Sequence, residues 1–158
     1  MLPPPIHIKK KAPEADAEKT FKLMLANDKR FQVKTDPDGV VRIFESGMPN
    51  DVLNIRVKRV KLSEEQRYNE KDAMSEVLQT PEVRTYFEAH NIDQPVDLGG
   101  LINPSDPRLP HLETAIENMT VLDALKHMLL VFGEAGIYKE AVGTRGHRVV
   151  SISFCAAN

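Results

Sequence analysis

Apolar and polar positions follow the same order at the two ends of the chain. Near the start, residues 6–9 alternate as in a short strand, and from Pro13 onward apolar residues recur at helical spacing. Alternating segments then flank an Asp-Pro-Asp-Gly sequence at residues 36–39, which is typical of a turn between two strands. The pattern therefore predicts a strand, helix and hairpin over residues 6–45.

The last third of the chain repeats this order. Residues 112–116 have an extended pattern, and Thr120 with Asp123 three positions later has the spacing of a helix N-cap. An apolar stripe at helical spacing follows before two glycines and a second pair of alternating segments. The stripe consists of Val121, Leu125, Met128, Leu129 and Phe132. We therefore expect a second strand–helix–hairpin unit over residues 112–154.

The middle section begins with another strand pattern. Within residues 52–91, the first segment, 52–62, alternates until the pattern slips near Arg59. Ser63 and Gln66 then have capping-box spacing, which predicts that a helical insertion starts there.

Two further signals shape this insertion. Thr80 followed by Pro81 predicts the start of another helix, and Asn91 is a suitable end for it. Residues 94–110 are rich in proline and glycine, a composition that forbids a long regular element and predicts a surface connection.

Together these elements predict an α+β fold. We expect a small mixed or antiparallel sheet with helices on one face, in which the two similar units flank the helical insertion. The length of 158 residues, with 41% hydrophobic and 28% charged residues, fits a single domain over 1–158 held by an apolar core. Cys155 is the one cysteine in the sequence, so an intramolecular disulfide is excluded.

Charge is unevenly distributed along the chain. The net charge of −2 disfavours binding to polyanions through overall charge, yet residues 1–61 hold 13 basic and 8 acidic side chains and the remainder 8 and 15. A basic run in the middle strand concentrates this positive charge: Arg56, Lys58, Arg59 and Lys61. Such a run either protects a sheet edge from unwanted pairing or forms a contact surface.

The neighbourhood of this basic run bears on its role. Residues 9–11, three lysines, would extend the positive face if the first strand paired with this one. Tyr68 is the nearest candidate for an exposed aromatic partner, whereas proteins that bind single strands interleave several aromatic side chains. Nucleic acid is accordingly the less favoured partner.

The sequence offers little catalytic or metal chemistry. None of the five histidines pairs with another at helical spacing, and the nearest approach to a site would bring His111 and His127 together with Glu113 and Glu117. Cys155 lies at the end of the last strand, and His147 is its nearest candidate base. We expect no enzyme, no cofactor and no metal.

One segment resembles a known family. Residues 118–129, Asn-Met-Thr-Val-Leu-Asp-Ala-Leu-Lys-His-Met-Leu, are followed by Gly136-Ile137-Tyr138 and a closing strand. Over residues 112–154 this resembles the short N-terminal domain of secretins and TonB-dependent receptors, and the arrangement is similar to that of stand-alone exported bacterial proteins of unassigned function. The resemblance implies a periplasmic, non-enzymatic module that contacts other proteins. It carries no catalytic residues.

These observations support three functional hypotheses. The first is a non-catalytic protein-interaction module of the bacterial cell envelope, periplasmic or secreted, whose partner is another protein and which has no membrane span. Because the sequence does not start with a signal peptide, this hypothesis expects one upstream in the gene. The alternative is a cytoplasmic nucleic-acid or polyanion binder that uses the basic strand Arg56–Lys61. An enzyme with His111 or His127 as acid or base is the third.

Overall fold

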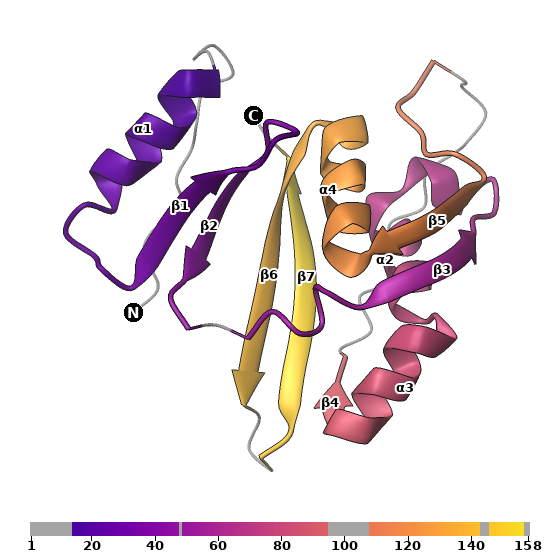
Figure 1. The fold of residues 1–158 in the computed structure, drawn as a ribbon. Coiled ribbons are helices and arrows are strands. Elements are labelled where there is room, and N and C mark those ends of the chain that lie inside the picture. Colours follow the sequence, from indigo (N-terminus) through magenta and orange to yellow (C-terminus); the bar gives the residue numbers. More distant parts are fainter. Residues whose placement is uncertain (1–13, 48, 95–107, 143–145, 157–158) are drawn as a thin grey trace. The chain divides into compact units, whose positions relative to one another are not determined.

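The computed structural model describes residues 14–47, 49–94, 108–142 and 146–156, and it divides into two compact units (Figure 1). The first, the N-terminal unit, comprises the described residues before Asn50, and the second, the main unit, comprises Asn50–Ala156. Each unit is described by itself. The predicted strand at residues 6–9, the lysines at 9–11 and most of the predicted connection at 94–110 lie outside the described residues.

The N-terminal unit is a helix and a hairpin. Helix α1 (Glu14–Met24) contacts strand β1 (Phe31–Thr35), which pairs antiparallel with β2 (Val41–Glu45). Gly39 has a φ of 82°, a backbone conformation that side chains disfavour, so the turn needs glycine there. The predicted helix and hairpin are confirmed.

The strands of the main unit form two small sheets. Strand β3 (Arg56–Lys61) pairs antiparallel with β5 (Ala115–Thr120). The second sheet has the order β4–β7–β6: β4 (Ile92–Asp93) is parallel to β7 (Arg148–Ala156), and β6 (Glu134–Val142) is antiparallel to it.

The helical insertion is short and well capped. Ser63 and Gln66 form the predicted reciprocal hydrogen bonds, but only the 3-10 turn η1 (Gln66–Tyr68) follows them. Helix α2 (Glu70–Leu78) starts instead at Asn69, whose side chain accepts hydrogen bonds from the backbone N–H groups of Lys71 and Asp72.

The other two helices begin and end where the sequence predicts. Helix α3 (Pro81–His90) has Pro81 in its first turn and ends at Asn91, which adopts a left-handed φ of 56°. Helix α4 (Val121–Phe132) is capped by Thr120, whose hydroxyl accepts a hydrogen bond from the N–H of Asp123 at 3.1 Å.

The core of the main unit lies around α2 and α4. Helix α2 contacts β3 and β7, whereas α4 contacts β5 and β6, so the two helices connect the β3–β5 ribbon with the other sheet (Figure 1). Residues with at most 2% of their surface exposed line both helices and the strands: Val57, Ala73, Met74, Val77, Ile116, Val121, Ala124, Met128 and Val150. Their burial is the main source of stability.

The α+β prediction is confirmed, with the described strands distributed over three small sheets. Two strands begin later in the chain than predicted. Residues 51–54 form a turn that buries Val52, so the strand begins at Arg56. Leu112 exchanges hydrogen bonds with Arg67 and not with a strand, so β5 begins three residues later than expected.

Candidate functional site

Strand β3 presents its four basic side chains to solvent. Val57 and Val60 are buried, while Arg56, Lys58, Arg59 and Lys61 are all exposed. Two consecutive exposed residues break the usual alternation of a strand. The break lies opposite Asn118, which has a left-handed φ of 53° and interrupts the pairing of β3 with β5. We call this set of four side chains the basic strand.

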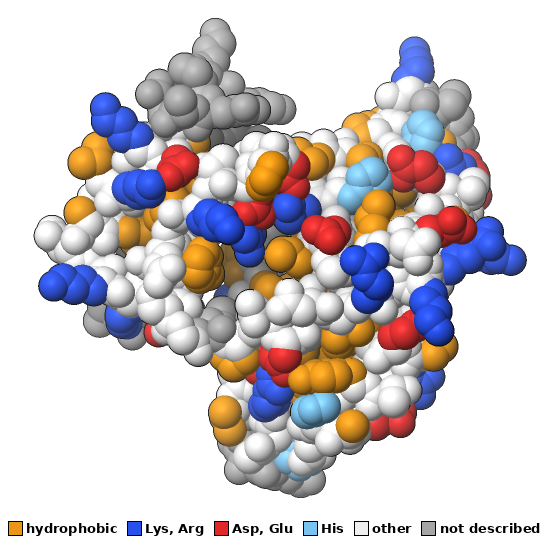
Figure 2. All heavy atoms as spheres, in the orientation of Figure 1, with side chains coloured by type: hydrophobic (Ala, Val, Ile, Leu, Met, Phe, Trp, Pro, Cys, Tyr) orange, Lys and Arg blue, Asp and Glu red, His pale blue; other side chains and the backbone are white. Residues whose placement is uncertain are grey.

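The four side chains of the basic strand differ in the contacts that they make. Arg59 forms an exposed ion pair with Glu117 at 2.9 Å, and Arg56 Nη1 donates a hydrogen bond to the carbonyl oxygen of Asn118 at 2.6 Å. Within the described ranges, no acidic side chain forms an ion pair with Lys58 or Lys61. Figure 2 shows Lys and Arg side chains projecting over the β3–β5 ribbon. Among the described strands, β3 pairs with β5 and no other, which leaves its second edge without a strand partner.

The structure corrects the expected role of Tyr68. Its side chain is buried, with 6% of its surface exposed, and its ring lies 5.1 Å from that of His111. Tyr68 ends η1 and faces the core, so it is unsuited to stack on a base beside the basic strand.

The four predicted acid, base or metal candidates do not converge. His127 Nε2 lies 2.9 Å from Glu113, and this contact lowers the pKa of the Glu113 carboxyl. His111 contacts the carbonyl of Leu109, and Glu117 is held by Arg59. In the part of the chain that the structure describes, no three His, Cys, Asp or Glu side chains are grouped so that they could hold a metal ion.

Cys155 and His147 do not form a catalytic pair. They are eight positions apart along the extended chain of β7, a separation of about 25 Å at the usual rise of a strand. His147 is 3.3 Å from Asp93 instead, and Cys155 is exposed. His147 is therefore not placed to act as a base for this thiol.

A polar cluster around Arg148 was not predicted from the sequence. Arg148 donates two hydrogen bonds of 2.9 Å to the carboxylate of Asp51 and also pairs with Glu140. Tyr86 donates to Asp51 at 2.6 Å, and Tyr138 donates to Glu140 at 3.1 Å. Burial, together with the charge of Glu140, raises the pKa of Tyr138, which keeps this donor protonated. The cluster joins the turn before β3 to α3, β6 and β7, and we assign it a structural role.

This cluster predicts acid sensitivity of the main unit. Hydrogen bonds from Arg148, and then from Tyr86, hold the pKa of Asp51 well below its ordinary value of 3.8. A carboxylate whose pKa is lowered on folding contributes stability that is present above its ordinary pKa and lost as the pH falls through the lower value. We expect the free energy of unfolding of the wild type to decrease as the pH drops below about 4. The Asp51→Asn variant should have a lower free energy of unfolding than the wild type at neutral pH, and this free energy should decrease less on acidification. Urea unfolding at several pH values measures this, and parallel curves for the two proteins would contradict it.

No family model, curated protein or solved structure matches this chain. The described helices include none with the length and apolar character needed to span a membrane.

Proposed function

We propose that this chain is a non-catalytic protein-interaction module of the bacterial cell envelope and that the basic strand is its contact surface. One observation carries the proposal: four exposed basic side chains lie on a strand whose second edge has no partner among the described strands. Lys58 and Lys61 lie in solvent without acidic partners in the described part of the chain, so their charge is available to a binding partner.

The chemistry of this edge suits an extended acidic segment of a partner. A free strand edge offers main-chain N–H and C=O groups to such a segment. Every second side chain of the bound segment then lies on the same face as, and next to, the side chains of the strand. Lys58 and Lys61 are exposed and would provide complementary charge, which raises the association rate and selects the partner. Arg59 contributes less, because binding must compete with its pair to Glu117.

The order of elements in the main unit supports placing the protein in the envelope. Strand β5, helix α4 and the β6–β7 hairpin follow one another as the resemblance to the secretin and TonB-dependent receptor domain implies. That family resemblance, with export to the periplasm or beyond, remains part of the proposal.

Charge reversal on the basic strand tests the proposal. We expect Lys58→Glu with Lys61→Glu to lose at least about 90% of the partner retained by the wild type from bacterial envelope extract, because attraction becomes repulsion. Both side chains are exposed, so the melting temperature should hardly change. The matched control is Lys139→Glu, a lysine on β6 that is also exposed. Equal recovery by all three proteins would refute the assignment of the surface.

The polyanion hypothesis uses the same four cations and has a distinct signature. It predicts binding to single-stranded oligonucleotides that weakens steeply with salt, by a slope that Lys58→Glu reduces by about one. The burial of Tyr68 disfavours it, because in the described strands β3 and β5 no aromatic side chain accompanies the four cations. We therefore rank it second.

A further inference from the structure

Strand β6 has a long edge that pairs with no described strand. All nine of its residues pair with β7, and among the described strands β6 has no other partner (Figure 1). Along this second edge, main-chain N–H and C=O groups are available to another strand. We call this row of groups the β6 edge.

The β6 edge lacks the features that protect most exposed edges from pairing. Residues 134–142 contain no proline, and their unbroken register with β7 leaves no bulge. Of the three charged residues of β6, only Lys139 is exposed. Ile137 and Val142 expose 43% and 74% of their surface. Pairing along this edge would remove part of this apolar surface from water.

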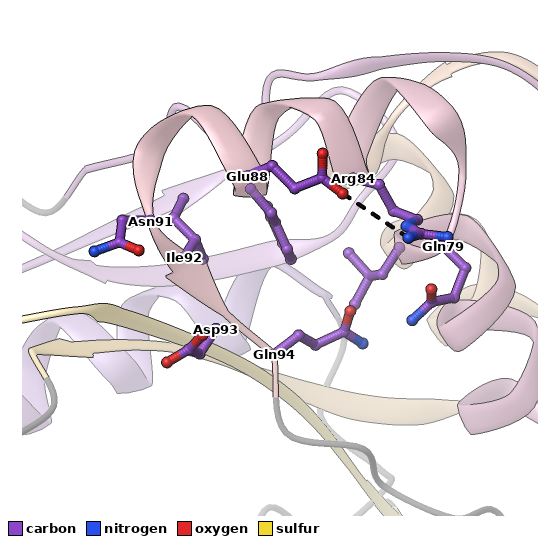
Figure 3. Close-up of a pocket in the computed structure, with 9 residues that line it drawn as sticks. Gln79, Arg84, Glu88, Asn91, Ile92, Asp93 and Gln94 are labelled. Atoms are coloured by element: carbon purple, nitrogen blue, oxygen red, sulfur yellow. Dashed lines mark ion pairs between the residues drawn. The ribbon is translucent and has the colours of Figure 1, made fainter.

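Among the described residues, the other strand edges of the main unit suit a second copy less well. Four of the six residues of β3 are basic, so two copies of β3 would bring like charges together, and Asn118 interrupts the pairing of β3 with β5. Figure 3 shows the opposite edge of the β6 sheet, where Asn91 turns α3 into β4. Strand β4 has only two residues, and a hollow of about 290 Å³ lined in part by Glu88 and Asp93 lies beside it. Of these edges, the β6 edge offers the long, uninterrupted ladder.

We propose that the β6 edge pairs antiparallel with the β6 edge of a second copy of this chain, with Tyr138 at the centre. Two identical strands pair in this way about a two-fold axis perpendicular to the sheet, which joins the same surface of both copies. Because directly opposed residues share a face, the axis passes beside a residue and not between two. The three-stranded sheets of the two main units then form one continuous sheet. This surface goes beyond the proposed function, and either can be wrong without affecting the other.

The charges of β6 select Tyr138 as the centre. In this register, every charged residue of β6 lies opposite an uncharged residue of the second copy. The opposed pairs that contain a charge are Glu134 with Val142, Glu140 with Gly136, and Lys139 with Ile137. Moving the centre to position 137 places Glu134 opposite Glu140, and moving it to position 139 places Lys139 opposite its own copy. Like charges directly opposite one another destabilise a sheet, and either shift also loses two of the nine residue pairs.

Sedimentation equilibrium of the full chain tests the pairing through position 137, which faces Lys139 of the second copy. We expect the wild type to form dimers at about 0.1 mM chain. Ile137→Glu introduces two attractive pairs into the dimer and Ile137→Lys two repulsive ones. The dissociation constant of the lysine variant should therefore be at least about tenfold higher than that of the glutamate variant. This difference should shrink in about 1 M salt.

Leu130 provides the matched control for these charges. It lies on α4 with 57% of its surface exposed, so Leu130→Glu and Leu130→Lys should dimerise with equal dissociation constants. Circular dichroism of all four variants shows whether each is folded. If Ile137→Lys fails to fold, a cysteine pair still decides.

The cysteine pair tests the register directly. Cys155 is first replaced by serine, because it pairs with Ala135 of the same chain and would capture a thiol there. In this background, Ala135→Cys together with Ala141→Cys should form covalent dimers on oxidation, because position 135 lies opposite position 141 of the second copy, within reach of a disulfide. Ala135→Cys alone should form few, because its two copies are six positions, or about 20 Å, apart along the paired strands.

Three results would each overturn the proposal. The first is a wild type that stays monomeric up to about 1 mM chain. The second is equal dissociation constants for Ile137→Glu and Ile137→Lys. The third is cross-linking by Ala135→Cys alone that matches the cross-linking of the cysteine pair.

Discussion

Replacing Arg148 by alanine is expected to lower the free energy of unfolding of the main unit by about 2 to 3 kcal/mol. The substitution leaves the carboxylates of Asp51 and Glu140 without the guanidinium that holds both. Glu140 is the more costly of the two, because only 7% of its side chain is exposed. The effect stays below that of a fully buried pair, since 26% of the Arg148 side chain and 32% of the Asp51 side chain reach solvent.

Urea unfolding followed by tyrosine fluorescence measures this loss. The three tyrosines, Tyr68, Tyr86 and Tyr138, all belong to the main unit, so the signal reports on that unit. Arg59→Ala is the matched control, because its pair with Glu117 is exposed and should contribute no more than about 1 kcal/mol. A loss at Arg148 no larger than that at Arg59 would show that the cluster does not hold the unit together.

Replacing Met128 by alanine is expected to cost about 3 kcal/mol. Met128 lies on α4 with none of its surface exposed, where the helix contacts α2, β5 and β6. Truncation removes apolar contacts and leaves a cavity that the surrounding elements fill incompletely. The helix itself is unaffected, because alanine has the highest helix propensity.

Leu130→Ala is the control for this second prediction. Leu130 lies two positions farther along α4 with 57% of its surface exposed, so its truncation should change the free energy of unfolding by no more than about 0.5 kcal/mol. The same urea series compares both variants with the wild type. Similar losses at the two positions would mean that α4 does not present the face described above to the core.

The sequence predicted much of the fold because local signals determine it. Three local features have the geometry that the sequence predicts: the N-cap formed by Thr120 with Asp123, the capping box of Ser63 with Gln66, and the helix end at Asn91. These signals depend on contacts within a few residues. The same locality explains one error: the Ser63 box closes on a short 3-10 turn, and Asn69 provides a better cap for the helix.

The polar cluster escaped prediction because its contacts are long-range. Asp51 and Arg148 are 97 positions apart, and no periodicity links them. One contact of the cluster could have been predicted from the register of the β6–β7 hairpin. Val142 pairs with Arg148 and Glu140 pairs with Val150, so Glu140 and Arg148 are diagonal neighbours on one face of the hairpin. The slipped alternation near Arg59 was noted in the sequence, but the left-handed conformation of Asn118, which lies opposite it in the partner strand, was not predicted.

The basic strand illustrates how far a functional prediction from sequence extends. Its four cations were identified as a basic run, of which strand alternation exposes three, and the exposure of all four follows from the break in β3 opposite Asn118. Tyr68 was misjudged because its burial depends on η1 and on its contact with His111.

The central claim is that a protein partner contacts β3, and site-specific photo-crosslinking in bacterial cells that express the full natural gene tests it most directly. A photoreactive residue is placed at Lys58, and at Lys139 as a control position that is also exposed. Our account predicts a crosslinked envelope protein at position 58, joined through an acidic extended segment, and no such product at position 139. Crosslinks at position 58 to nucleic acid, or the same products from both positions, would contradict it.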